Sequence, residues 1–327
     1  MVKISCITTT FNDGKALLGS VNSVLNQSFE NFQYIIVDDG SSEETRDVVT
    51  GLKDDRILVV TQANDGLAGA RNKAIEQVSG DYVCFLDADD MRPNWAFQAM
   101  AELIERDDPD LIFGRGILSE IRGDIVPFYD TRLFELIETM CGANPVEADS
   151  QLAKAIWPLA QFIEPQSANK IVRTDLLRSS GARFPNTHFF EDIYFHTNIL
   201  AAAQRVSFLH APTFAYFRRY QRPQITSSSS DLRFDIIPVT KLTLETFARR
   251  PQFHDPVYRT AVVVSCFKIL QWCETSISHH YRHHYRQAVQ AILRLIDPLF
   301  LHFPPEPPEG LEQFRPVELY IESLTHA

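Results

Sequence analysis

Short apolar runs alternate with amphipathic segments through the first 115 residues of the chain. Each apolar run has the length of a strand, and each intervening segment repeats its apolar positions every three or four residues, as a surface helix does. Strands that alternate with helices in this way predict an α/β fold with a mostly parallel sheet flanked by helices. The expected strands are 2–7, 34–37, 57–60, 82–86 and 111–113, and the expected helices are about 17–25, 43–52, 70–78 and 93–105.

The pattern changes twice along the remaining sequence. Prolines interrupt residues 125–165, which we interpret as an insertion over the sheet edge, and the serines at 227–230 indicate a loop or domain boundary. Beyond residue 231 the pattern predicts a C-terminal helical region, with a proline-rich linker at 304–308. The further expected elements are strands at 169–173, 206–209 and 214–217, helices at 174–177, 191–203 and 316–324, and long helices over 257–303 interrupted near 279–284.

Three carboxylates follow the apolar run at 82–86 directly: Asp87, Asp89 and Asp90. Burying such a group without partners costs several kcal/mol, so these residues must lie at a surface or hold cations. Asp87 and Asp89 alternate along the chain, and an extended backbone directs both to one side. Carboxylate pairs of this kind suit Mg²⁺ or Mn²⁺. The residues alone leave two interpretations open, a metal site and a solvated acidic turn.

Other expected strands of this half also end in polar residues. Asn12 follows the first strand, Asp39 the second and Asp65 the third. In a parallel sheet the carboxyl ends of neighbouring strands meet at one edge, where α/β proteins bind their ligands. The repetition therefore predicts one crevice lined by all of these side chains.

Composition narrows the classes of function. The formal net charge of the 327 residues is −11 and the pI is about 5.4, which argues against a nucleic-acid partner because such proteins present a basic face. No apolar run reaches the length of a membrane span, and no signal-peptide pattern precedes the first strand. The five cysteines include no Cys-x-x-Cys pair. These features predict a cytoplasmic protein.

Four segments in the first third of the chain, 4–12, 36–41, 64–72 and 85–90, resemble the motifs of family 2 glycosyltransferases, in the order that the family has them. Four ordered motifs are far more specific than a single Asp-x-Asp. The resemblance extends more loosely to about residue 230 and does not cover the C-terminal region. One departure is the segment 8–12, where many relatives have a proline and a tyrosine. The family implies a GT-A fold with a Rossmann-like sheet, inverting transfer and a nucleotide-sugar donor.

The resemblance implies roles for individual residues of the first half. Asp39 would accept a hydrogen bond from a uracil ring. Asp65 and Arg71 would flank the base and the ribose, and Asp87 would face the ribose or the donor sugar. Asp89 would hold Mn²⁺ or Mg²⁺, with Asp87 and Asp90 as further candidate ligands. The residues implied near the nucleobase and the donor are Thr8, Thr9, Thr10 and Asn12.

The second half carries a candidate for the reaction itself. Glu191 and Asp192 resemble the acidic pair that precedes a helix in this family, where the aspartate is the general base. Inverting transfer needs one carboxylate to take the proton of the acceptor hydroxyl, and we assign Asp192 first and Glu191 second. The alternative is that both only complement a helix dipole. Residues 169–170 and 218–219 are weaker candidates for acceptor and diphosphate contacts, the two arginines being equally compatible with a solvated face.

The resemblance implies one catalytic domain at 1–230, with a nucleotide-binding half at 1–115 and an acceptor half at 116–230, followed by the helical region at 231–327. The apolar helices of that region are compatible with docking on the catalytic domain, with a homodimer, or with peripheral attachment to the inner face of a membrane. Docking is favoured because it buries them without a partner. His279, His280, His283 and His284 have i,i+4 spacing but no neighbouring carboxylate or cysteine, so a wet helix face is favoured over a zinc site.

The function expected is metal-assisted, inverting transfer of a sugar from a UDP-sugar to a hydroxyl of a glycan or lipid-linked glycan, in surface polysaccharide biosynthesis. A phosphatase of the Asp-x-Asp type is the first alternative, because Asp87 and Asp89 also resemble its motif. That class places the motif after its first strand and a threonine soon after it, whereas here the strand is the fourth and Met91 follows Asp90. The second alternative is a glycosyltransferase-like protein that binds without catalysis.

Overall fold

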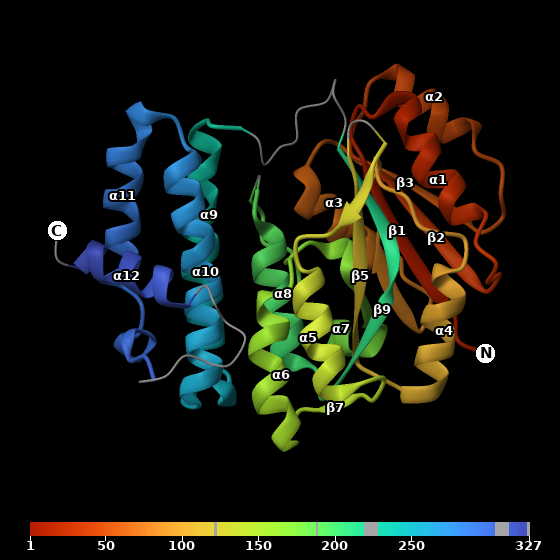
Figure 1. Ribbon diagram of the computed structural model, residues 1–327. Helices are drawn as coiled ribbons and strands as arrows, with labels where there is room; N and C mark the ends of the chain where they lie inside the picture. The colour runs from red at the N-terminus through yellow and green to blue at the C-terminus, as the bar shows by residue number, and fades with distance from the viewer. Residues whose placement is uncertain (121–122, 188, 219–227, 305–313, 326–327) are drawn as a thin grey trace.

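A computed structural model describes residues 1–120, 123–187, 189–218, 228–304 and 314–325. Within these ranges the chain forms a nine-stranded sheet of order β3-β2-β1-β4-β8-β5-β9-β7, with β6 paired to β5 (Figure 1). The strands are β1 Ile4–Thr10, β2 Phe32–Asp38, β3 Ile57–Thr61, β4 Tyr82–Phe85, β5 Leu111–Ser119, β6 Ile125–Pro127, β7 Val146–Glu147, β8 Lys170–Arg173 and β9 Arg205–Phe217.

The sheet has a parallel half and a mixed half. Strands β1 to β4 run parallel, as the alternating pattern predicts. The return strand β8 inserts antiparallel between β4 and β5, and β9 runs parallel to β5, so the sheet as a whole is mixed. The two short strands predicted at 206–209 and 214–217 are one continuous strand, whose register against β5 shifts between Gly114 and Gly116.

Helices cover both faces of the sheet (Figure 1). Residues of α1, α2 and α4 share one buried apolar cluster with the sheet, and residues of α3, α5, α6, α7 and α8 share another on the opposite face. Alternate residues of the strands supply the two clusters, for example Cys6 to the first and Ile7 to the second. These helices are α1 Leu17–Leu25, α2 Glu43–Gly51, α3 Gly66–Ile75, α4 Ala96–Asp107, α5 Thr131–Cys141, α6 Gln151–Phe162, α7 Thr174–Ser179 and α8 Glu191–Ala202.

The C-terminal helical region continues the second cluster. Helix α9 packs against α8, and α10 packs against α6. Val262 and Phe267 of α10 are fully buried in the same cluster as the sheet residues, which is the docked arrangement favoured from sequence. Figure 1 shows α10 beside α6, with α11 and α12 on its outer side. The helices of this region are α9 Ile236–Phe247, α10 Pro256–Ser276, α11 His279–Leu293 and α12 Phe314–Thr325.

Some details differ from the expected pattern. The long helices break between Ser276 and His279, ahead of the predicted position, so the four histidines lie in the first turns of α11 on its exposed side. Of the proline-rich stretch 304–308, only Pro304 falls within the described residues, and Ser227 of the serine run falls outside them. Over the described ranges, every helix falls short of the length and apolar character needed to cross a membrane.

Candidate active site

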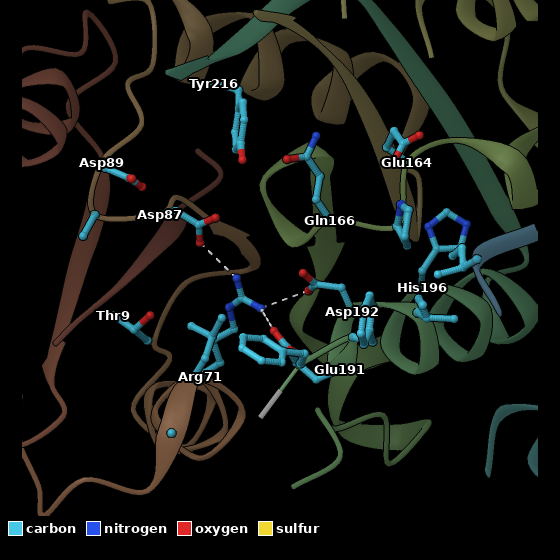
Figure 2. Close-up of a pocket in the computed structure, with 18 of the residues that line it drawn as sticks. Thr9, Arg71, Asp87, Asp89, Glu164, Gln166, Glu191, Asp192, His196 and Tyr216 are labelled. Carbon is cyan, nitrogen blue, oxygen red and sulfur yellow. Dashed lines mark hydrogen bonds and ion pairs between the residues drawn. The ribbon is translucent and has the colours of Figure 1, made fainter. Parts of the chain in front are cut away.

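A cavity of about 1160 Å³ opens at the carboxyl ends of β1, β2 and β4 and extends to the C-terminal helices. Residues from 1–115, from 116–230 and from α10 line it together. Figure 2 shows Asp87 and Asp89 on one side, Asp192 facing them, and Glu164, Gln166 and His196 beyond. The predicted site residues that line the cavity are Thr9, Thr10, Asp39, Arg71, Asp87, Asp89, Glu191 and Asp192.

Four predicted residues do not line the cavity and instead shape its loops. Thr8 is buried, and its hydroxyl accepts a hydrogen bond from the Tyr34 hydroxyl at 3.0 Å. The backbone N–H of Asp65 donates to Asp39. Asn12 has a positive φ of 59° and accepts a hydrogen bond from the backbone N–H of Ser42 at 2.7 Å, which ties the loop after β1 to the start of α2. The fourth of these residues is Asp90.

Asp39 lies buried at the end of β2, where the nucleobase is expected. Its Oδ1 accepts hydrogen bonds from Gln62 Nε2 at 2.7 Å and from the backbone N–H of Asp65 at 2.9 Å. Both of these bonds go to Oδ1, so Oδ2 can accept from a ligand. The next residue, Gly40, has φ of 77°, and a Cβ there would lie 2.8 Å from the backbone nitrogen of Asn64. Glycine is therefore needed for the close approach that fixes Asp39.

Arg71 of α3 joins the two halves of the site. Its Nη2 donates to Asp87 Oδ1 at 2.9 Å, and its Nη1 donates to Glu191 Oε1 at 2.8 Å and Asp192 Oδ1 at 3.0 Å (Figure 2). The Arg71 side chain is only 3% exposed, and its guanidinium lies 5.1 Å from the centre of the Phe184 ring. The resemblance places Arg71 beside base and ribose, whereas its donors here are engaged by three carboxylates.

One guanidinium faces three carboxylates, and this imbalance shifts their protonation. Burial, followed by the charge of Asp192, raises the pKa of Glu191 to about 8. Burial also raises the pKa of Asp192, against the opposing effect of Arg71. Burial works to lower the pKa of the Arg71 guanidinium, but the carboxylates outweigh it and the pKa is raised. Arg71 is therefore a permanent cation, and the acidic pair holds protons more tightly than free carboxyl groups do.

The raised pKa of Glu191 predicts how stability depends on pH. The folded chain binds this proton more tightly than the unfolded chain, so the contribution of Glu191 to stability falls as pH rises from 4.5 towards about 8. One such group contributes a slope of at most about 1.4 kcal/mol per pH unit. We expect Glu191→Gln to flatten this dependence in chemical denaturation at about pH 5, 6.5 and 8. A slope equal to that of the unmodified protein would contradict the assignment.

The loop after β4 separates its three carboxylates. Asp89 is half-buried and lines the cavity with Asp87, whereas Asp90 is buried and accepts a hydrogen bond from the backbone N–H of Phe217 at 3.1 Å. In the described part of the chain, no group of three or more metal-binding side chains gathers. The residues thus do not form an all-protein metal cage. They do fit a Mg²⁺ or Mn²⁺ site of one or two carboxylates completed by substrate phosphates.

Lys170 and Asn169 lie behind the wall of the cavity that Glu164 and Gln166 form. The Lys170 ammonium is buried and donates to the carbonyls of Pro165 at 2.9 Å and Gln166 at 2.6 Å, and to Asn169 Oδ1 at 2.8 Å. Asn169 Nδ2 donates to the carbonyl of Glu164. Both residues therefore hold the loop that presents Glu164 and Gln166 to the cavity. Burial lowers the pKa of Lys170 to about 7.

Arg218 lines the cavity but is already paired. Its Nη1 forms an ion pair with Glu120 at 3.0 Å, and its Nη2 donates to the Tyr129 hydroxyl. Arg219 lies outside the described residues. These contacts of Arg218 are compatible both with a solvated face and with a ligand contact, so the role of the two arginines stays a prediction.

Sequence reasoning missed several side chains of the cavity because they come from parts of the chain without motifs. Tyr216 of β9 directs its hydroxyl into the cavity (Figure 2), and burial and the charges of the β4 loop raise its pKa. His196 of α8 is buried, and burial lowers its pKa well below the ordinary value. Glu191 and Asp192 lie about one turn before His196 on the same helix. This spacing places His196 on the same side of α8 as the acidic pair, and it could have identified His196 from the sequence. The other missed residues include Glu164, Gln166, Lys268 and Trp272.

Comparison with known proteins finds relatives among glycosyltransferases. Residues 5–135 match the model of glycosyl transferase family 2. The chain is 38% identical over 112 residues to the amylovoran biosynthesis glycosyltransferase AmsB of Erwinia amylovora, covering 32% of this chain and 36% of AmsB. It is 37% identical over 91 residues to WfaP of Escherichia coli, named as a UDP-Glc:α-D-GlcNAc-diphosphoundecaprenol β-1,3-glucosyltransferase, covering 28% of this chain and 36% of WfaP. These matches span about a third of the length of either relative.

The fold is shared over nearly the whole chain with a solved structure. The crystal structure of S. aureus TarS 1-349 in complex with UDP-GlcNAc superposes with a TM-score of 0.75, covering 98% of this chain and 92% of that one at 19% identity. The likeness includes the C-terminal helices, which the family model does not reach. Taken with the ordered motifs, these findings show a GT-A fold, and residues 5–135 match glycosyl transferase family 2.

Proposed function

We propose that this protein transfers a sugar with inversion from a UDP-sugar to a hydroxyl of a glycan or lipid-linked glycan, in surface polysaccharide biosynthesis. The observation that carries the proposal is the arrangement around Arg71, which brings Asp192 of the acceptor half and Asp87 of the nucleotide-binding half to one guanidinium. Inverting transfer by single displacement needs its base and its leaving-group site on opposite sides of one reacting carbon. Asp192 and Asp87 line one cavity, which supports their assignment to these two places.

The donor end of the cavity has the chemistry expected for a uridine diphosphate. Asp39 Oδ2 can accept the imide N–H of uracil, with Oδ1 held by Gln62 and Asp65. Asp89 and Asp87 would hold Mn²⁺ or Mg²⁺ beside the diphosphate, and the ion would offset the charge of the leaving group. The donors in the names of WfaP and of the TarS complex are both UDP-sugars, which supports the same class here.

Asp192 is the better placed of the two candidate bases. Its side chain is 22% exposed, whereas that of Glu191 is 4% exposed. Arg71 bonds only Oδ1 of Asp192, which leaves Oδ2 to take the proton of an acceptor hydroxyl. Its raised pKa also improves it as a base, because a stronger base pulls the proton further in the transition state. Glu191 then serves to hold Arg71 in place.

The metal assignment predicts a specific binding defect. We expect Asp89→Ala to abolish the Mn²⁺ dependence of UDP binding, because it removes a cavity-lining carboxylate beside the diphosphate. Calorimetric titration with UDP, with and without Mn²⁺, measures the effect. Asp55→Ala is the matched control, since Asp55 is exposed and does not line the cavity. Metal-dependent affinity that survives in Asp89→Ala would remove Asp89 from the metal site.

The proposal is tested by following release of UDP from a panel of UDP-sugars, first with water and then with simple sugar acceptors. We expect one or a few donors to be turned over. The anomeric proton coupling of the product should show a configuration opposite to that of the donor. Retention of configuration would exclude the single-displacement role of Asp192, and turnover of phosphate esters instead would favour the phosphatase alternative.

A further inference from the structure

Helix α10 supplies a wall of the cavity, although it lies far outside the matched family model. Four of its residues line the cavity, and their spacing along the helix puts them on one face. That face is therefore part of the site and not only a packing surface. The four residues are Ser265, Lys268, Ile269 and Trp272.

Lys268 differs from the other cations of the cavity. Arg71 and Arg218 pair with carboxylates, and Arg233 donates to the Ser228 carbonyl at 2.6 Å. Lys268 is half-buried and, among the described residues, makes neither a hydrogen bond nor an ion pair. An ammonium group removed in part from water without a partner is unfavourable, and an anionic ligand would relieve this cost.

The surroundings of Lys268 do not neutralise it. The acid that it faces is Glu164, with which it forms no ion pair in the described structure. Burial raises the pKa of Glu164, and the charge of Lys268 acts against this shift. Arg233 stacks 4.2 Å from the centre of the Trp272 ring on the same side and adds positive charge. This part of the cavity lining therefore presents two cationic side chains, Lys268 and Arg233, beside the single carboxyl group of Glu164.

We propose that Lys268 binds an anionic group, a phosphate or a carboxylate, of the acceptor. This proposal rests on the function proposed above, and it adds that the acceptor is charged. Lys268 and Asp192 line the same cavity, so one acceptor bound in it can meet both side chains. Trp272, which is 42% exposed, contributes apolar surface beside it. The C-terminal helices thereby select the acceptor, while the family motifs handle the donor.

The test is a binding measurement on the full chain saturated with UDP and Mn²⁺. The probes are glucose 6-phosphate, glucuronic acid and the neutral methyl glucoside. We expect at least one anionic probe to bind about 10-fold or more tightly than methyl glucoside, and Lys268→Met to lose about 10- to 100-fold in affinity for it. Lys268→Arg should retain most of the preference. Lys154→Met is the matched control, because Lys154 is exposed on α6 and lies outside the cavity.

Each outcome of this binding test either supports or overturns the role of Lys268. A phosphate-only or carboxylate-only preference identifies the source of the anion. Equal binding of the three probes by the unmodified protein, or an unchanged preference in Lys268→Met, overturns the proposal. Thermal melting of each variant excludes misfolding as the cause of a loss. If UDP binds and only the anion preference is missing, the acceptor assignment fails alone; if UDP does not bind, the proposed function fails with it.

Discussion

Replacing Asp192 by asparagine should reduce sugar transfer by about two to four orders of magnitude, the size of a general-base contribution. Asparagine keeps the shape of the side chain and an oxygen for Arg71, but its amide cannot take a proton at neutral pH. Donor binding should therefore stay within a few-fold of normal. The measurement is kcat for UDP-sugar turnover with acceptor, with calorimetric UDP binding on the same preparation.

Glu191→Gln is the matched control for this variant. Glu191 contacts the same guanidinium, but its side chain is almost inaccessible to solvent. Glu191→Gln should therefore retain much more of the transfer rate than Asp192→Asn does. If instead Asp192→Asn transfers at nearly the normal rate and Glu191→Gln does not, the base is Glu191. If both transfer normally, the acidic pair only complements the dipole of α8.

Removing Arg71 should destabilise the fold by about 3–5 kcal/mol, the usual cost of deleting one partner of a buried ion pair. Its loss leaves the carboxyl groups of Asp87, Glu191 and Asp192 close together without the guanidinium that pairs with all three. We expect Arg71→Met, which keeps part of the side-chain volume, to show this loss in chemical denaturation near neutral pH. Transfer should fall as well, because Asp192 loses the contact that orients it.

The pH dependence of the stability of Arg71→Met separates the effect of lost charge pairing from the effect of lost packing. Protonation of the carboxylates relieves their repulsion, so the difference in stability between Arg71→Met and the unmodified protein should shrink as pH falls towards about 5. Adding Glu191→Gln should recover part of the loss above about pH 8, since only there is Glu191 ionised and its charge left without Arg71. A deficit independent of pH and of Glu191 would assign the effect to packing against Phe184.

The parallel half of the fold was predictable because its signals are local. Strand runs, helical periodicity and the polar residues after each strand lie within a few positions of one another, and the Asp39 and Asp87 loops indeed line one cavity. Helix α8 likewise begins at Glu191, as its acidic first turn indicates. The boundary at residue 230 between a catalytic domain and a C-terminal helical region stays a prediction.

The parts of the fold and of the candidate site that the sequence did not predict depend on contacts between distant segments. No pattern near Arg71 indicates that residues 120 positions away would take up its donors. The sequence around Lys170 does not show that its ammonium turns inwards to three oxygen acceptors instead of meeting a ligand. Antiparallel insertion of β8 and the apposition of α10 to the cavity are also set by tertiary packing, which outweighs local preference.

The central claim is that the cavity binds a uridine diphosphate donor with the help of a divalent cation. Calorimetric titration of the full chain with UDP and with GDP, each with and without Mn²⁺, tests it most directly. The account predicts saturable UDP binding that depends on Mn²⁺ and is clearly tighter than GDP binding. Tighter GDP binding would contradict the role of Asp39 in reading uracil, and binding of neither nucleotide would contradict the donor site altogether.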